Sequence, residues 1–68
     1  MMRSGVRYLY VTGCEFVSGG AGEASATDKH QEARKQFQDL KKDPSVKSAY
    51  LRQYEVTSRL VEEEVHNK

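Results

Sequence analysis

The segment Asp28–Asp43, DKHQEARKQFQDLKKD, decides the fold because its periodicity and both of its boundaries predict the same helix. Residues suited to burial recur at the spacing of one helical face, and charged or polar residues occupy the other positions. The inner positions are His30, Ala33, Phe37 and Leu40. Asp28 is the expected N-cap with Gln31 completing a capping box, and Pro44 ends the helix. A stripe this narrow cannot hold an isolated helix in water, so the flanking segments must supply the surface on which it packs.

The segment Val6–Val17, VRYLYVTGCEFV, predicts a first β-strand, since it is rich in aromatic and β-branched residues and has no helical stripe. Both of its alternating faces carry apolar residues, which is typical of a central strand. Gly13 interrupts the run and is a candidate bulge, which would swap the faces of the residues that follow.

A glycine-rich stretch at 18–23 predicts a turn, because glycine adopts positive φ at no steric cost. A phosphate-binding loop is the competing interpretation, but the Gly-Lys-Ser/Thr ending and the Gly-x-Gly-x-x-Gly spacing are both missing. The segment Glu23–Thr27, EASAT, then predicts a short returning edge strand, which is weak because alanine, serine and glutamate are poor strand formers.

The region after Pro44 fits both the period of a strand and the period of a helix. Val46–Val56 carries aromatic and β-branched residues at even positions, which predicts a strand. Asp43 as N-cap with Pro44 at the first helical position begins an alternative helix, although many residues of low helix propensity follow. The strand is favoured. The tail Thr57–Lys68 either continues this strand or forms a short helix capped by Ser58.

Together these segments predict a small single α+β domain over residues 1–68. It consists of a β-hairpin, a helix and a further strand (ββαβ), with the helix packed on a mainly antiparallel sheet and the first strand at the centre beside the third. The alternative is a β-hairpin followed by a helical hairpin. Disorder is expected at residues 1–5 and 66–68.

Composition excludes several classes of protein. Eleven basic and ten acidic residues give a net charge of +1, so no general attraction to nucleic acid or to a membrane surface is expected. A single cysteine cannot form an internal disulfide, which favours a reducing, cytoplasmic location. No apolar run approaches the roughly 20 residues that span a bilayer. The order of elements has a loose likeness to small bacterial and phage-encoded proteins, and no motif names a family.

The residues that could carry catalysis do not cluster in the sequence. Cys14 is expected to be a small buried apolar side chain, His30 a partly buried neutral ring, and His66 part of a solvated tail. One cysteine and two distant histidines match no zinc spacing, and Glu62–Glu64 is interpreted as a solvated face. We therefore expect no catalytic residues, no metal, no cofactor and no enzymatic activity.

The tyrosines give the strongest clue to a binding surface. Tyr8, Tyr10, Tyr50 and Tyr54 occupy even positions of two predicted strands, and Phe16 and Arg52 have the same parity. If the two strands are neighbours, these side chains can share one sheet face. A single helix covers only one face. Whether it covers the tyrosines or the set of Leu9, Val11 and Leu51 stays open.

Two functions follow from this surface. The leading hypothesis is a non-enzymatic interaction protein, of accessory or inhibitor type, that binds a second copy or another protein through a sheet face or edge. The alternative is a nucleic-acid-binding module, in which the tyrosines stack on bases while Arg7, Lys47 and Arg52 contact phosphates. The nearly neutral net charge counts against the alternative.

Overall fold

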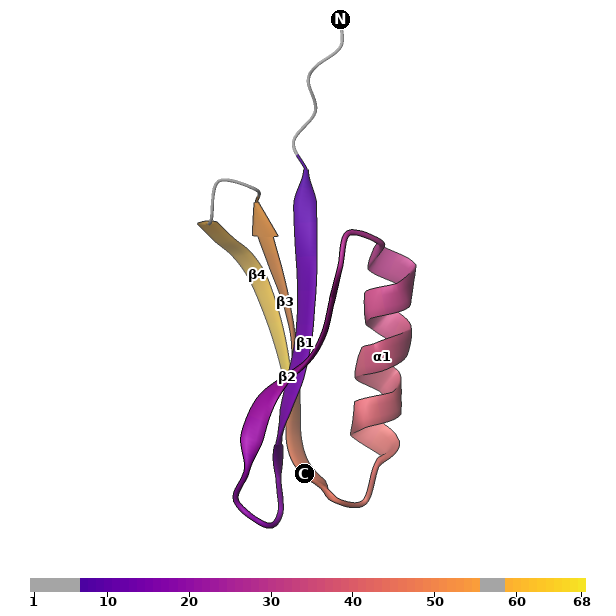
Figure 1. Ribbon diagram of the computed structural model, residues 1–68, viewed down its shortest axis with the longest axis vertical. Coiled ribbons are helices and arrows are strands. Elements are labelled where there is room, and N and C mark those ends of the chain that lie inside the picture. The colour runs from indigo at the N-terminus through magenta and orange to yellow at the C-terminus, as the bar shows by residue number, and fades with distance from the viewer. Residues whose placement is uncertain (1–6, 56–58) are drawn as a thin grey trace, which may run out of the picture.

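One helix packs on a four-stranded antiparallel sheet in this computed structural model, which describes residues 7–55 and 59–68 (Figure 1). The elements in chain order are β1 (Tyr8–Phe16), β2 (Ala21–Thr27), α1 (His30–Lys42), β3 (Val46–Glu55) and β4 (Arg59–Asn67). The sheet order is β2-β1-β3-β4. The α+β prediction is confirmed, and β1 is central with β3 beside it. The expected start of the first strand at Val6, the end of the third at Val56 and the disorder of residues 1–5 lie outside the described residues.

The region after Pro44 is the strand β3, so the helical-hairpin alternative is wrong. The tail holds a fourth strand, β4, which pairs antiparallel with β3 and was not predicted either as a separate strand or in its extent. His66 and Asn67 belong to β4, in contrast to the disorder expected there. Glutamate-rich sequence joins a sheet because cross-strand partners outweigh intrinsic strand preference, and Arg52 supplies such a partner to Glu63. The expected cap Ser58 lies outside the described residues.

The boundaries of α1 differ in one respect from the prediction. Its N-cap residue is Lys29 and not Asp28, and no side chain caps the helix there. Thr27 instead accepts a hydrogen bond at Oγ1 from the backbone N–H of Lys29, at 3.1 Å. At the other end, the Asp43 carboxylate accepts hydrogen bonds from the backbone N–H of Ser45 (2.9 Å) and from its hydroxyl (2.7 Å). These bonds lower the pKa of Asp43 and form the turn that leads into β3.

The hairpin turn between β1 and β2 is tighter than predicted. β2 begins at Ala21, and Gly19 takes the positive φ of 106° that glycine accommodates. The pairing of β1 with β2 is irregular at Gly13, as expected, but the extra residue is Ala24 of β2. The faces of β1 therefore do not swap, and Cys14 stays on the side that α1 covers.

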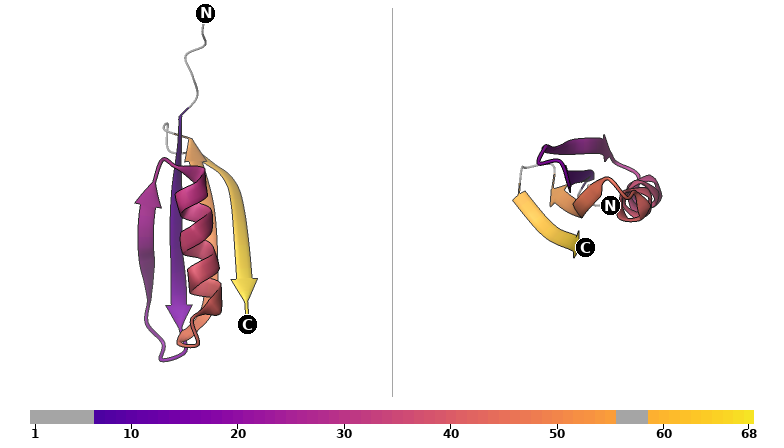
Figure 2. Two further views of the ribbon diagram at one scale, coloured as in Figure 1. Left: turned by 90° about the vertical axis from the view of Figure 1, so that its right-hand side faces the viewer. Right: turned by 90° about the horizontal axis from the view of Figure 1, so that it is seen from below.

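The core lies between α1 and the middle of the sheet. Ala33 and Phe37 of α1 are completely buried, and Leu40 packs at the margin. Beneath them are the buried side chains of Cys14, Val46, Ala49 and Leu51. Burial raises the pKa of the Cys14 thiol, which is the expected behaviour of a small apolar side chain. The helix lies in front of β1 and β3, with β2 on one side of it and β4 on the other (Figure 2). It packs on β3, β1 and β2.

Phe37→Ala should lower the free energy of unfolding by about 3–5 kcal/mol, because it leaves a cavity at the centre of the contact between α1 and the sheet. That is a large share of the stability of a chain of this size. Urea unfolding followed by circular dichroism measures the change. Gln36→Ala, on the exposed side of the same turn, should alter stability by no more than about 0.5 kcal/mol. Equal stability of the two variants would contradict the packing described.

Candidate functional site

The register of β1 against β3 decides which residues lie under the helix, because cross-strand partners share a sheet face. From Tyr8 to Glu15, even-numbered residues of β1 pair with odd-numbered residues of β3: Tyr10 is opposite Gln53, and Leu9 is opposite Tyr54. The pairing then shifts, and Phe16 is opposite Val46, which is buried under α1. Tyr8, Tyr10 and Phe16 therefore lie on the face that α1 covers, and Tyr50, Arg52 and Tyr54 lie on the opposite face. The prediction that all four tyrosines share one face is wrong. Leu51 is under the helix, and Leu9 and Val11 are on the other side.

Side-chain size explains this register. The space beneath Phe37 holds the small residues Cys14 and Ala49, and a tyrosine there would overfill it. On the opposite face, the ring of Tyr50 lies over Gly13, its partner in β1. A Cβ atom at Gly13 would clash with the end of the Tyr50 side chain, and it would come within 2.7 Å of the Gly22 carbonyl oxygen. Gly13 is thus the position that admits the tyrosine ring.

The uncovered face, called the open face below, has a charged pair at its centre. The Arg52 guanidinium lies 4.0 Å from the centroid of the Tyr50 ring. Its Nε donates a hydrogen bond of 2.6 Å to the Glu63 carboxylate of β4. This bond raises the pKa of Arg52, while burial raises the pKa of the Tyr50 hydroxyl and the nearby Arg52 charge opposes that rise. The centre of the open face is therefore ordered and close to neutral.

Large apolar side chains surround this pair. Leu9 and Leu60 both pair with Tyr54, one on each side, and Val65 pairs with Tyr50. Leu9 is 41% exposed, Leu60 48% and Val65 53%. The open face thus comprises Leu9, Val11, Tyr50, Arg52, Tyr54, Leu60, Glu63 and Val65. β2 adds Glu23 and Ala26 to the same face, opposite Gly13 and Val11. All four strands therefore contribute to this surface, and no described element covers it (Figure 2).

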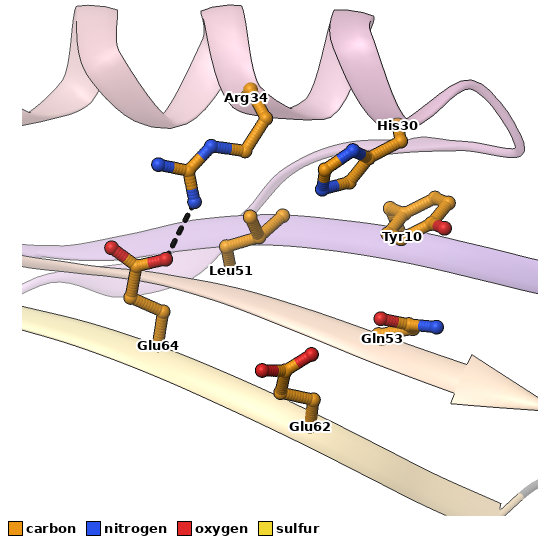
Figure 3. Close-up of a pocket in the computed structure, with 7 residues that line it drawn as sticks. All are labelled: Tyr10, His30, Arg34, Leu51, Gln53, Glu62 and Glu64. Carbon is orange, nitrogen blue, oxygen red and sulfur yellow. Dashed lines mark hydrogen bonds and ion pairs between the residues drawn. The ribbon is translucent and has the colours of Figure 1, made fainter.

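A second surface is the groove between α1 and β4, on the other side of the sheet. It encloses about 250 Å³. Its lining residues are Tyr10, His30, Arg34, Leu51, Gln53, Glu62 and Glu64 (Figure 3). Arg34 reaches down from α1 to Glu64 with an Nη1–Oε1 distance of 2.5 Å, and the rings of Tyr10 and His30 lie 4.9 Å apart. Glu62 points into the same groove and forms no ion pair with any described residue.

The residues that were candidates for catalysis lie in different environments. Cys14 is buried under α1, whereas His30 is exposed on α1 and His66 is half-buried on β4. Over residues 7–55 and 59–68, no group of three or more histidine, cysteine, aspartate or glutamate side chains is arranged to hold a metal ion. In the same part of the chain, no helix has the length and apolar character needed to cross a membrane.

Sequence reasoning missed every site residue contributed by β4. Leu60 and Val65 reach the open face, and Glu62 and Glu64 reach the groove, only because the tail is a strand. A strand that packs on a core usually alternates apolar with polar residues. Neither alternate set in this tail is uniformly apolar: one is Leu60, Glu62, Glu64 and His66, and the other is Val61, Glu63 and Val65. The feature that could have indicated a strand here is the glutamate run, since its carboxylates can pair with the basic side chains of Arg34 and Arg52.

Gly13→Ala should destabilise the protein by about 1–3 kcal/mol, because the added methyl group displaces Tyr50 and presses on the backbone of β2. Urea unfolding gives the stability, and the aromatic NMR signals of Tyr50 report the displacement. Gly22→Ala is the matched control, since a Cβ atom there meets nothing within 4 Å. If both variants were equally stable, the Tyr50 ring would not occupy the space above Gly13.

No family model, no curated protein and no solved structure matches this chain. The two surfaces of this chain, the open face and the groove beside β4, are therefore the basis on which a function can be proposed.

Proposed function

We propose that the protein is a non-enzymatic binding protein whose open face is covered by a second copy of the chain. The observation that carries this proposal is the exposure of Leu9, Leu60 and Val65 on one uncovered sheet face. Contiguous apolar surface on a small protein marks an interaction site more often than a free surface. Two-fold packing of identical surfaces is the commonest arrangement in small homo-oligomers.

The size of the open face suits a dimer. Strands of seven to ten residues make a four-stranded face of roughly 30 by 15 Å, from the rise per residue and the spacing of strands. Two such faces in contact would bury on the order of 1,000 Å² in total, which is about the lower limit for a specific interface. The open face therefore supports a modest dimer, and not an obligate one.

The charges on the open face also permit self-association. Arg52 and Glu63 compensate each other within one copy, so contact with a second copy would bury a pair and not an isolated charge. The Tyr50 and Tyr54 rings can be buried while their hydroxyl groups keep hydrogen-bond partners at the margin. The Arg52–Glu63 pair therefore presents no net charge to a second copy, while Glu15 and Glu23 lie toward the β2 side of the face.

The absence of a catalytic role is supported by the positions of the reactive side chains. Cys14, the candidate nucleophile, lies in the core with its pKa raised by burial, which keeps it in the unreactive thiol form. Of the two candidate bases, His30 packs on Tyr10 in the groove beside β4, and His66 lies on β4 with β3 between it and Cys14. Nucleophilic catalysis needs the two groups within hydrogen-bond reach, and no such bond links them.

The nucleic-acid alternative loses its main support. It required a single face with four tyrosines for base stacking, and the register divides them between two faces. Arg52, one of its proposed phosphate contacts, is already bound to Glu63. Nucleic-acid binding that weakens steeply as salt is added would support this alternative.

Sedimentation equilibrium at about 100 μM tests the dimer, since an interface of roughly 8 kcal/mol is mostly assembled at that concentration. The wild-type chain should sediment with twice the monomer mass. Val65→Lys should shift it to monomer, because the added charge would be desolvated in the interface. Leu9→Lys, on β1, should have the same effect from another strand of the same face.

The control is Val17→Lys, a substitution of similar chemistry at a residue that is 65% exposed in the hairpin turn, outside the open face. It should leave the dimer intact. A wild-type chain that is monomeric at this concentration would overturn the proposal. So would a dimer that is insensitive to both Leu9→Lys and Val65→Lys while each variant keeps its fold by circular dichroism.

A further inference from the structure

β4 is an uncovered edge strand. It pairs with β3 on one side, and on the other side no described strand pairs with it. α1 packs on the other three strands and meets β4 through the Arg34–Glu64 ion pair, so the helix lies on the inner side of β4 and leaves its outer edge uncovered (Figure 2). Within Arg59–Asn67, every residue except His66 is exposed. Half of the backbone N–H and C=O groups of such a strand point outward and can pair with an added strand.

The usual structural protections of an edge are weak along most of β4. The strand has nine residues and contains neither proline nor glycine. Its one irregularity, the extra residue Val61, lies near the start. From Glu62 to Asn67 the pairing with β3 is regular, so the outward edge of this stretch is regular too.

Charge is the property that selects a partner for this edge. Glu62, Glu63 and Glu64 are consecutive, and antiparallel two-fold pairing of β4 with its own copy would bring these glutamates opposite one another. Like charges directly opposite destabilise a strand pair, whereas opposite charges stabilise it. A second copy of β4 is therefore disfavoured, and a strand with basic side chains is favoured.

The two glutamates on the helix side define the spacing of that basic partner. Glu62 and Glu64 alternate with Glu63 and point from β4 toward the groove (Figure 3). Glu64 already contacts Arg34, but Glu62 has no ion-pair partner among residues 7–55 and 59–68. Tyr10 and Leu51 form the apolar part of the groove wall on the inner side of these carboxylates.

We infer that β4 binds an extended basic segment of another protein, which adds as a fifth strand and places lysine or arginine side chains, two residues apart, opposite Glu62 and Glu64. Main-chain hydrogen bonds supply the affinity of such a complex, and the alternating side chains supply its specificity. The β4 edge is a different surface from the open face, so its occupation and the dimer can be tested separately.

The test is an NMR titration of the isotope-labelled full chain with a synthetic peptide of about eight residues, within the usual range of strand lengths, in which lysine and threonine alternate. Two effects are expected. The amide signals of β4 should shift, and its outward-facing amides should become protected from hydrogen exchange. The amides of β2, the other edge strand, should show neither effect. Replacing the lysines of the peptide with glutamine should weaken binding by about tenfold.

Glu62→Gln/Glu64→Gln removes the two carboxylates without changing side-chain shape and should also weaken binding of the lysine peptide by about tenfold. The matched control, Glu15→Gln/Asp39→Asn, removes the same net charge at exposed positions away from β4 and should bind as the wild type does. Binding weakened equally by both variants, or binding without amide protection in β4, would show nonspecific charge attraction and overturn the inference. Pairing of β4 with its own copy in the absence of peptide would overturn it as well.

Discussion

The packing of Phe37 on the small side chains of the central strands is the contact on which the rest of the structure depends. The ring is completely buried, and Cys14 and Ala49 leave room for it. Because these small residues must lie under α1, the register of β1 and β3 is constrained, and tyrosine at position 50 has to take the other face. Gly13 then admits its ring. One buried aromatic side chain thus determines which residues the sheet presents to solvent.

The length of the helix sets the second constraint. Thirteen residues lie over three strands, and the fourth strand is held to the sheet by β3 and by side-chain contacts such as Arg34–Glu64. Exposed ion pairs of this kind contribute little stability individually. The two surfaces that result differ in charge: the open face is compensated at its centre, whereas the β4 edge carries three consecutive glutamates. Self-association therefore suits the face, and a basic partner suits the edge.

Local signals were sufficient to predict much of the fold from the sequence. The helix, the central first strand and the strand after Pro44 each have a period or a terminator that short-range physics can interpret. The fourth strand could not be predicted in this way, because glutamates opposite Arg52 and Leu51 gain their strand character from partners that are distant in sequence. The N-cap prediction was wrong for a similar reason. Thr27, at the end of β2, and not Asp28 accepts a hydrogen bond from the backbone N–H of Lys29, the N-cap residue.

The binding surface shows a stricter limit. Residue parity sorted β1 into two faces correctly, and β3 from Ser48 onward. It was wrong for Val46, which lies under α1 with Ala49 and Leu51 because the pairing with β1 shifts at the start of β3. Parity also says nothing about how the faces of neighbouring strands correspond. A register that pairs even with even residues would have united the tyrosines. The observed register pairs Leu9 with Tyr54 and divides them. That choice depends on the volume available beneath Phe37, which is a property of the packed core and not of either strand alone.

The most direct test of the central claim, that a second copy covers the open face, is an isotope-filtered NMR experiment on an equimolar mixture of labelled and unlabelled chains. It detects only contacts between copies. The account predicts intermolecular contacts from the methyl groups of Leu9, Leu60 and Val65, and none from the buried methyl groups of Val46 beneath α1. Intermolecular contacts restricted to the groove side of the sheet, or no contacts from any of the three open-face residues at a concentration of about 1 mM, would contradict it.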